Sequence, residues 1–130
     1  MPLEHGSYSI SKEDDIIRYD VSGSFNGRGA KAWSEAVKSE IESLNGRPFK
    51  VLVSHLQLEG GTPEAYDIAD AFNQWLNKQN MLAKAIVSQS PIVEQIERRN
   101  VSAKQHQNIC YFSTLDEAVT WLRSIPGSKT

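Results

Sequence analysis

The sequence predicts a single α/β domain built on one mixed, mostly parallel sheet of five strands with four helices. Short segments in which apolar residues alternate or run continuously indicate strands, and segments in which they recur at three- and four-residue steps indicate helices. The two kinds of segment alternate along most of the chain, which is typical of a parallel sheet covered by helices. The length of 130 residues predicts one domain over 1–130, with its core at about 7–125.

The chain begins with two short alternating segments joined by an acidic turn. The connection, Glu13–Asp15, is so short that the segments are expected to pair as an antiparallel hairpin. The apolar residues expected on one side of each strand are Tyr8 and Ile10 in the first, and Ile17, Tyr19 and Val21 in the second.

A helix and a buried strand are expected next. Apolar residues recur at helical spacing from Ala30 to Leu44. Asn45-Gly46 is expected to end this helix, because glycine adopts the left-handed cap conformation easily. Phe49–Val53 is a nearly continuous apolar run, which is typical of a strand buried on both faces of a parallel sheet.

The second half of the chain continues the alternation of helix and strand. Two helices have clear start signals, a capping serine before proline at Ser90-Pro91 and the capping box TLDE at Thr114–Glu117. The predicted elements are a helix from Thr62, a strand at Ala83–Val87, a helix from Ser90, a strand at Ile109–Phe112 and a helix from Thr114 to Ile125. The complete order is therefore β-β-α-β-α-β-α-β-α.

The composition limits the classes of function. The chain has 14 basic and 16 acidic side chains and a net charge of −2, which argues against a nucleic-acid-binding protein. The single cysteine, Cys110, excludes a disulfide within the chain and favours a reducing compartment. Because we find no signal peptide and no run of roughly 18 apolar residues that would span a membrane, we expect a cytoplasmic protein of bacterial type.

Four predicted loops lie where a strand ends and the next helix begins. In open parallel sheets, ligands bind at this edge. All four carry serine or threonine. They are expected either to cap the following helices or to hold a small anion on free helix amides. The loops are Ser22–Gly29, Ser54–Thr62, Ser88–Pro91 and Ser113–Leu115.

The stretch LEGGTPEAYD, Leu58–Asp67, combines a helix start with a pair of glycines. Thr62, followed by proline and glutamate, has the pattern of a helix N-cap. The cap does not explain Gly60 and Gly61, which permit positive φ and a close approach of the backbone to another group. They indicate either a tight turn or a surface kept open for a partner.

The segment VLVSHLQLEGGTPEAYD, Val51–Asp67, followed by FNQWL at Phe72–Leu76, resembles the SpoIIAA-like family of the STAS superfamily. This is the fold of bacterial anti-sigma-factor antagonists, and the family is also compared with the lipid-carrying Sec14 domains. The resemblance extends over about Ser7–Ile125. It implies a regulatory module that binds a protein partner, or a carrier for a small apolar or lipid-like ligand.

In the antagonists, the loop after the third strand carries an aspartate-serine-glycine motif whose serine is phosphorylated to switch partner binding. The matching positions here are Glu59, Gly60, Gly61 and Thr62, and none of them is serine. Thr62 carries the hydroxyl group of this loop segment and is the candidate phosphosite, although its role as a cap already accounts for it.

The helix that follows this loop has a wide apolar arc. Tyr66 and Trp75 extend it beyond the stripe that a helix on one sheet face requires. Either neighbouring helices bury this surface, or Tyr66, Phe72 and Trp75 border a groove or a homodimer contact.

Three groups of residues suggest a chemical site and are not favoured as one. Ser54 and His55 are adjacent, but neighbours on a strand point to opposite faces, so a nucleophile–base pair is not expected. The histidines have no metal-ligand spacing, so no metal is predicted. The basic cluster Arg98, Arg99 and Lys104 is interpreted as a solvated helix end.

The sequence therefore supports three functions, in order of preference. The first is a non-catalytic interaction or regulatory module that binds a protein partner or a second copy through the loop and helix after the third strand. The second is a carrier of a small apolar or lipid-like ligand, and the third is a small hydrolase. The possible ligands are a small apolar molecule or an anion. No catalytic residue or cofactor is assigned. The candidate binding residues are Ser54, Glu59, Gly60, Gly61, Thr62, Tyr66, Phe72 and Trp75.

Overall fold

The computed structural model describes residues 3–127 and confirms the predicted fold class. Its five-stranded sheet has the order β1-β2-β3-β4-β5. The first pair is antiparallel and the other three pairs are parallel. The elements are β1 (Ser7–Glu13), β2 (Ile16–Phe25), α1 (Gly27–Glu42), β3 (Phe49–Gly61), α2 (Pro63–Leu76), β4 (Met81–Val87), α3 (Pro91–Asn100), the 3-10 helix η1 (Ser102–His106), β5 (Ile109–Phe112) and α4 (Leu115–Ser124).

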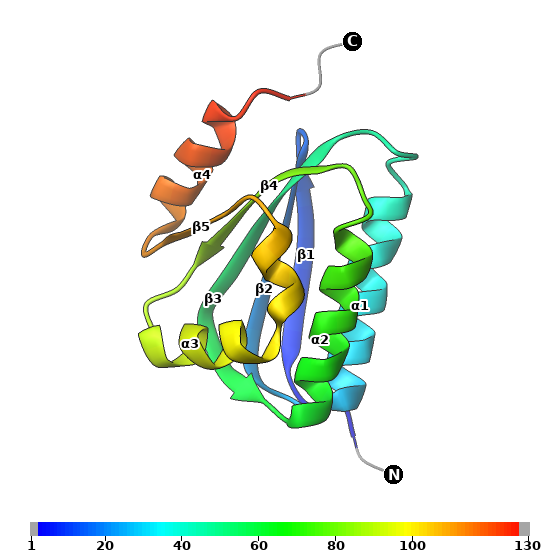
Figure 1. Ribbon diagram of the computed structural model, residues 1–130, viewed down its shortest axis with the longest axis vertical. Helices are drawn as coiled ribbons and strands as arrows, with labels where there is room; N and C mark the ends of the chain where they lie inside the picture. Colours follow the sequence, from blue (N-terminus) through cyan, green and yellow to red (C-terminus); the bar gives the residue numbers. More distant parts are fainter. Residues whose placement is uncertain (1–2, 128–130) are drawn as a thin grey trace.

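The helices cover the two faces of the sheet unequally (Figure 1). The larger core lies between α1, α2 and the strand residues Val51, Val53 and Ile86. The smaller core lies on the opposite face, where Leu52 and Ala85 pack against α4. Strand residues alternate between these two cores as the pleat of a sheet requires.

The third strand is longer than predicted. It extends through Gly61 rather than ending at Val53, and β2 extends through Phe25. Pairing between the two strands continues as far as Phe25 and Gly61. The predicted loop Ser54–Thr62 is therefore largely strand, and the first half of Ser22–Gly29 is strand as well. Backbone pairing between β2 and β3 overrides the glycine-rich composition of these segments.

The N-terminal caps are formed largely as predicted. Oγ1 of Thr62 accepts a hydrogen bond from the Ala65 amide at 3.1 Å. Ser90 and Thr114 accept corresponding bonds from the third residues of their helices. The first helix begins earlier than Ala30, because Asn26 caps it at Gly27. These bonds account for the hydroxyl groups of Thr62, Ser90 and Thr114.

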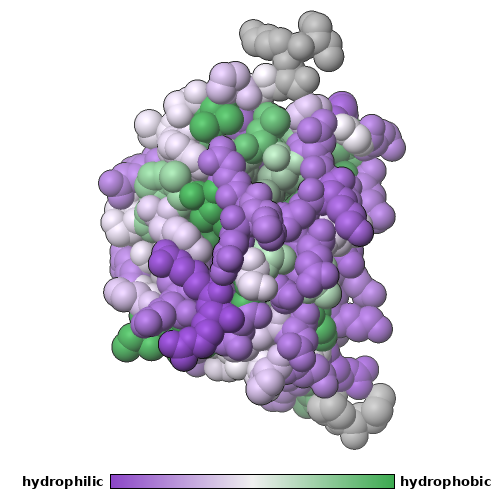
Figure 2. Space-filling model, in the orientation of Figure 1, coloured by the Kyte–Doolittle hydropathy of each residue, from purple (hydrophilic) through white to green (hydrophobic). Residues whose placement is uncertain are grey.

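Polar side chains cover most of the face shown in Figure 2, and apolar residues appear on it in several separate areas. Two exposed apolar residues belong to α3, where Ile92 is 70% exposed and Ile96, one turn later, is 41% exposed. No helix within residues 3–127 is both long and apolar enough to cross a membrane.

Candidate functional site

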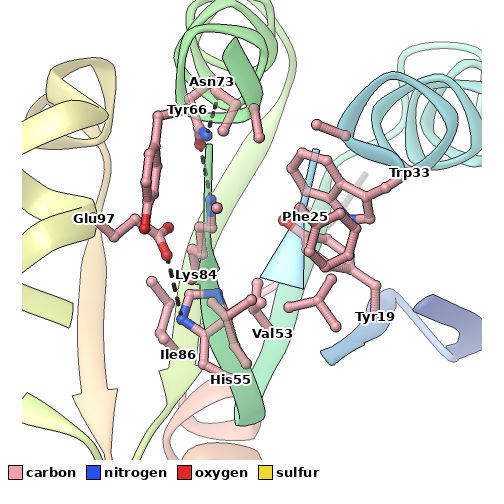
Figure 3. Close-up of a pocket in the computed structure, with 17 residues that line it drawn as sticks. Tyr19, Phe25, Trp33, Val53, His55, Tyr66, Asn73, Lys84, Ile86 and Glu97 are labelled. Carbon is pink, nitrogen blue, oxygen red and sulfur yellow. Dashed lines mark hydrogen bonds and ion pairs between the residues drawn. The ribbon is translucent and has the colours of Figure 1, made fainter. Parts of the chain in front are cut away.

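A cavity of about 70 Å³ lies beneath α2, between that helix, α1 and the sheet. We call it the α2 cavity. Its two sides differ in chemistry (Figure 3). Phe25 and Trp33 form an aromatic side, whereas His55, Lys84 and Glu97 form a polar side. Such a site can hold a small molecule with an apolar body and a polar head.

The glycine pair of the EGGT loop forms part of the cavity wall. Gly60 has φ of +147°, a conformation that residues with a side chain rarely adopt. Gly61 is tightly packed, since a Cβ added there would lie 3.3 Å from Cβ of Ala65. Gly60 is therefore needed for the backbone conformation of the wall, and Gly61 for its close packing against α2.

A second, open groove lies outside the cavity at the carboxyl ends of β2 and β3. We call it the outer groove. Its lining includes Phe25, Gly60, Gly61 and Tyr66, which also line the α2 cavity. These four residues separate the two spaces. A molecule that enters the cavity from the groove must therefore pass them.

A β-bulge lies where His55 is placed. Between the pairs Asp20–Ser54 and Ser22–Gln57, β2 advances by two residues and β3 by three. His55 itself keeps the alternation of the strand, because Val53, two residues earlier, lines the same cavity. His55 lines the cavity and is buried, with 6% of its surface exposed.

His55 joins β3 to helix α3 through two carboxylates. Its Nδ1 lies 2.9 Å from Oε2 of Glu94 and 3.6 Å from Oε2 of Glu97. The two glutamates are three residues apart and therefore lie on the same side of the helix. This interaction fixes α3 beside the polar side of the cavity.

Glu97 lies between His55 and Lys104, whose Nζ is 2.7 Å from Oε1 of Glu97. Burial opposes the ionisation of Glu97, but the neighbouring His55 and Lys104 outweigh it and lower its pKa to about 2. Burial lowers the pKa of Lys104, and the Glu97 carboxylate reverses that effect, so the net pKa of Lys104 is raised. The pair is therefore charged at neutral pH.

Lys84 is at the centre of β4 and is 3% exposed. Its Nζ donates a hydrogen bond to Oδ1 of Asn73 on α2 at 2.9 Å. Burial, followed by the positive charge of Lys104, lowers the pKa of Lys84 to about 7. A large fraction of Lys84 is therefore a neutral amine at physiological pH.

Three side chains of the polar side also meet a geometric condition for a metal site. One ligand atom from each of His55, Glu94 and Glu97 lies within 4.8 Å of the others. Lys104 already occupies one oxygen of Glu97, and its positive charge opposes a bound cation. We therefore interpret these residues as an ion-pair network.

The predicted binding residues fall into three places. Gly60, Gly61 and Tyr66 line both spaces, and Glu59 and Thr62 line the outer groove. Ser54 is buried and is not part of the cavity lining, so it does not form a pair with His55. Phe72 is 1% exposed and offers no surface to a partner, and Trp75 is half-buried with Lys38 over its ring.

Sequence reasoning missed most of the polar side. Lys84 had a visible signal, because a lysine interrupts the apolar run AKAIV of a strand predicted to be buried. Glu94 and Glu97 had a weaker signal in their helical spacing. The interpretation of Lys104 as part of a solvated helix end is wrong, since Lys104 is 5% exposed and bonded to Glu97.

No model of a protein family matches the chain, and no curated protein matches its sequence. Solved structures match its fold. An uncharacterised protein of the DUF3478 family with a SpoIIAA-like fold, from Shewanella loihica, has a TM-score of 0.68 and 16% identity over 94% of this chain and 97% of that chain.

Two anti-sigma factor antagonists also match. The antagonist from Mycobacterium paratuberculosis has a TM-score of 0.65 and 18% identity, covering 92% of this chain and 95% of its own. The antagonist SpoIIAA in its unphosphorylated form has a TM-score of 0.66 and 10% identity, covering 93% of this chain and 100% of its own. These likenesses establish the fold that the sequence resemblance implied, that of the SpoIIAA-like proteins.

Proposed function

Because the chain has the SpoIIAA-like fold, we propose that it is a non-catalytic regulatory module that binds one small amphipathic molecule in the α2 cavity. The observation that carries this proposal is the two-sided lining of the cavity. Phe25 and Trp33 suit an apolar body, and His55 and Lys84 suit a head that accepts hydrogen bonds or carries negative charge.

The volume of the cavity limits the ligand. A space of about 70 Å³ holds a few non-hydrogen atoms, given that one water requires roughly 10–15 Å³ on a comparable measure. A complete lipid does not fit unless α2 moves. The ligand that we propose is therefore a short carboxylic acid or a molecule of similar size and polarity.

The experiment is an NMR titration of the ¹⁵N-labelled chain with butanoate and benzoate. Binding in the cavity should shift the backbone amide signals of Gly60, Gly61 and Lys84. Ala69→Leu places a larger side chain at the cavity lining, and Ala71→Leu makes the same change at an exposed position of the same helix. The proposal requires that Ala69→Leu weakens binding and Ala71→Leu does not.

A clean apo mass of the purified chain in native mass spectrometry, together with no titration shifts for either acid, would contradict ligand binding. Shifts that are equal in the two leucine variants would place the ligand outside the cavity. Either result would return the protein to the class of pure interaction modules.

A second candidate function is recognition of a protein, favoured by the exposed apolar residues beside the outer groove. Val93 and Ile96 line this groove, and Ile92 is exposed next to them. Apolar side chains at such an edge are typical of contact surfaces. The occupant that we propose is a second copy of this chain, through α3 and the loop before Thr62.

Sedimentation equilibrium tests this candidate. The double substitution Ile92→Ser with Ile96→Ser should weaken dimerisation about tenfold or more if these residues are central to the contact. Tyr8→Ser, at an exposed position of β1, serves as the control. A chain that stays monomeric at all concentrations, or a dimer unaffected by the double substitution, would exclude this contact.

A further inference from the structure

Lys84 differs from the other buried lysines of residues 3–127 in the group that it contacts. Nζ of Lys50 and Nζ of Lys104 lie 3.4 Å and 2.7 Å from carboxylate oxygens. Nζ of Lys84 has no carboxylate within the 4.0 Å ion-pair distance and donates to the neutral side chain of Asn73. A buried lysine without a counter-ion lacks the usual reason for its burial.

The partner of Lys84 is already committed to other groups. Oδ1 of Asn73 also accepts a hydrogen bond from Gln107 at 3.0 Å, and Nδ2 of Asn73 donates to the Ala69 carbonyl at 2.8 Å. These bonds hold the amide in place, so it orients the lysine amine without neutralising it. Nζ makes no other hydrogen bond among the described residues, and Lys84 lines the α2 cavity, where its amine can meet a bound molecule.

The surroundings keep this amine reactive. Burial and the positive charge of Lys104 lower the pKa of Lys84 to about 7, so the uncharged form is available at neutral pH. Neutral lysine amines in apolar sites, especially beside another cation, are the nucleophiles that condense with carbonyl compounds. The aromatic side of the cavity supplies an apolar surface for the rest of such a molecule.

We propose that Lys84 captures a small aldehyde or ketone reversibly as an imine within the α2 cavity. This inference rests on the proposed function, because the carbonyl compound must enter the same cavity. It names the chemical class of the ligand: a carbonyl group with a short apolar tail. Capture of this kind is a binding event and requires no turnover.

The step balances without a further reactant. The lone pair of the neutral Nζ attacks the carbonyl carbon, and the carbonyl π electrons move to oxygen. One proton moves from nitrogen to this oxygen and completes the carbinolamine. A second proton then moves from nitrogen to the hydroxyl group, the C–O bond breaks, and one water leaves as the C=N bond forms. Hydrolysis reverses each step and releases the carbonyl compound.

Two neighbouring side chains are placed to move protons during this exchange. His55 and Tyr66 line the same cavity, and Glu97 lies beside both of them (Figure 3). Tyr66 also lines the outer groove, so the water that leaves has a path past Gly60 and Gly61. We assign these residues to positioning and proton exchange, and the covalent bond to Lys84.

The test is reductive trapping on the full chain. Butanal and sodium cyanoborohydride are added at pH 7, and each lysine that acquires a butyl group is located by peptide mass spectrometry. Lys84 should be modified at least about tenfold faster than the exposed Lys78, because its neutral fraction is larger. Mapping uses the unchanged chain, so the result does not depend on whether a Lys84 variant folds.

Controls separate this inference from the proposed function. Trapping at Lys84 should fall at least about fivefold in Ala69→Leu and remain unchanged in Ala71→Leu. Butanoate shifts without preferential trapping would overturn imine capture and leave ligand binding intact. Neither shifts nor trapping would overturn both, and trapping that persists in Ala69→Leu would overturn capture within the cavity.

Discussion

Nδ1 of His55 lies 2.9 Å from Oε2 of Glu94, and both side chains are buried although 39 residues separate them in the sequence. This contact joins the bulge of β3 to helix α3. Glu97, one turn further along α3, also contacts His55 and binds Lys104 in η1. One side of the α2 cavity is therefore held by charge pairs, and the other side by packed aromatic rings.

Such a network makes α3 sensitive to single changes. A buried ion pair contributes modestly compared with an apolar contact of the same size, but removal of one partner leaves the other buried and uncompensated. The stability of this region therefore depends on Glu97, which contacts both His55 and Lys104.

Replacement of Glu97 by Gln should lower the free energy of unfolding by about 3 kcal/mol at pH 7, because His55 and Lys104 lose their shared carboxylate. Urea denaturation measures this loss. The matched control is Glu13→Gln, which breaks the exposed contact of 2.9 Å with Arg123 and should cost less than about 1 kcal/mol.

The pH dependence of the Glu97 effect has a definite sign. Its pKa is about 2 in the folded chain against an ordinary 4.5, so it stabilises the fold above pH 4.5 and the contribution is lost as pH falls through 2. The difference between the unchanged chain and Glu97→Gln should therefore shrink over that range. A difference that stays constant down to pH 2 would contradict the charge network.

Lys84 should produce a pH effect of the same sign at higher pH. Its pKa is about 7 when folded and 10.5 ordinarily, so the unfolded chain binds the extra proton between these values. The stability of the unchanged chain should therefore rise by up to about 1 kcal/mol per pH unit relative to Lys84→Met. Urea denaturation between pH 7 and 9.5 measures this slope, with the exposed Lys78→Met as control.

Parallel curves for the unchanged chain and Lys84→Met over that range would show that Lys84 is charged in the folded state. The buried neutral amine would then be excluded, and with it the nucleophile on which imine capture depends. A constant offset alone reports the lost hydrogen bond to Asn73 and would not count as the predicted slope.

The sequence predicted the order of the elements because each one depends on local patterns. The helix start at Thr62 and the buried run Phe49–Val53 were predicted from a few adjacent residues. The length of β3 was not, because Ser54–Gly61 becomes a strand through pairing with β2 and has no clear strand pattern of its own. Local propensity is a weak guide where partner strands decide the structure.

The polar side of the cavity could not be predicted from local sequence patterns, for a similar reason. Lys84, Glu97 and Lys104 come from a strand, a helix and a 3-10 turn, and only tertiary packing brings them together. A charged residue inside an apolar strand is a warning that such a cluster exists. The identity of its partners cannot be read from spacing.

Two substitutions at Thr62 separate the contribution of its hydroxyl group to stability from that of its methyl group. Thr62→Ala should lower the free energy of unfolding by about 1 kcal/mol, because the Ala65 amide loses its side-chain acceptor. Thr62→Ser retains the oxygen and should cost clearly less. Equal losses in the two variants, measured by thermal unfolding, would assign the effect of Thr62 to packing.

Gly60 is the position where the cavity wall depends most on backbone geometry. Gly60→Ala should lower the free energy of unfolding by about 1–3 kcal/mol, because φ of +147° is accessible almost only to glycine. The added Cβ would lie 3.7 Å from the Tyr66 hydroxyl, an ordinary contact, so the cost comes from the backbone rather than from crowding. Calorimetric unfolding measures this loss.

The control is Ala71→Gly, which changes the same atoms at an exposed helix position and should cost only about 1 kcal/mol. If Gly60→Ala is neutral, the loop adopts another conformation in solution, and the wall between the cavity and the outer groove is not the one described.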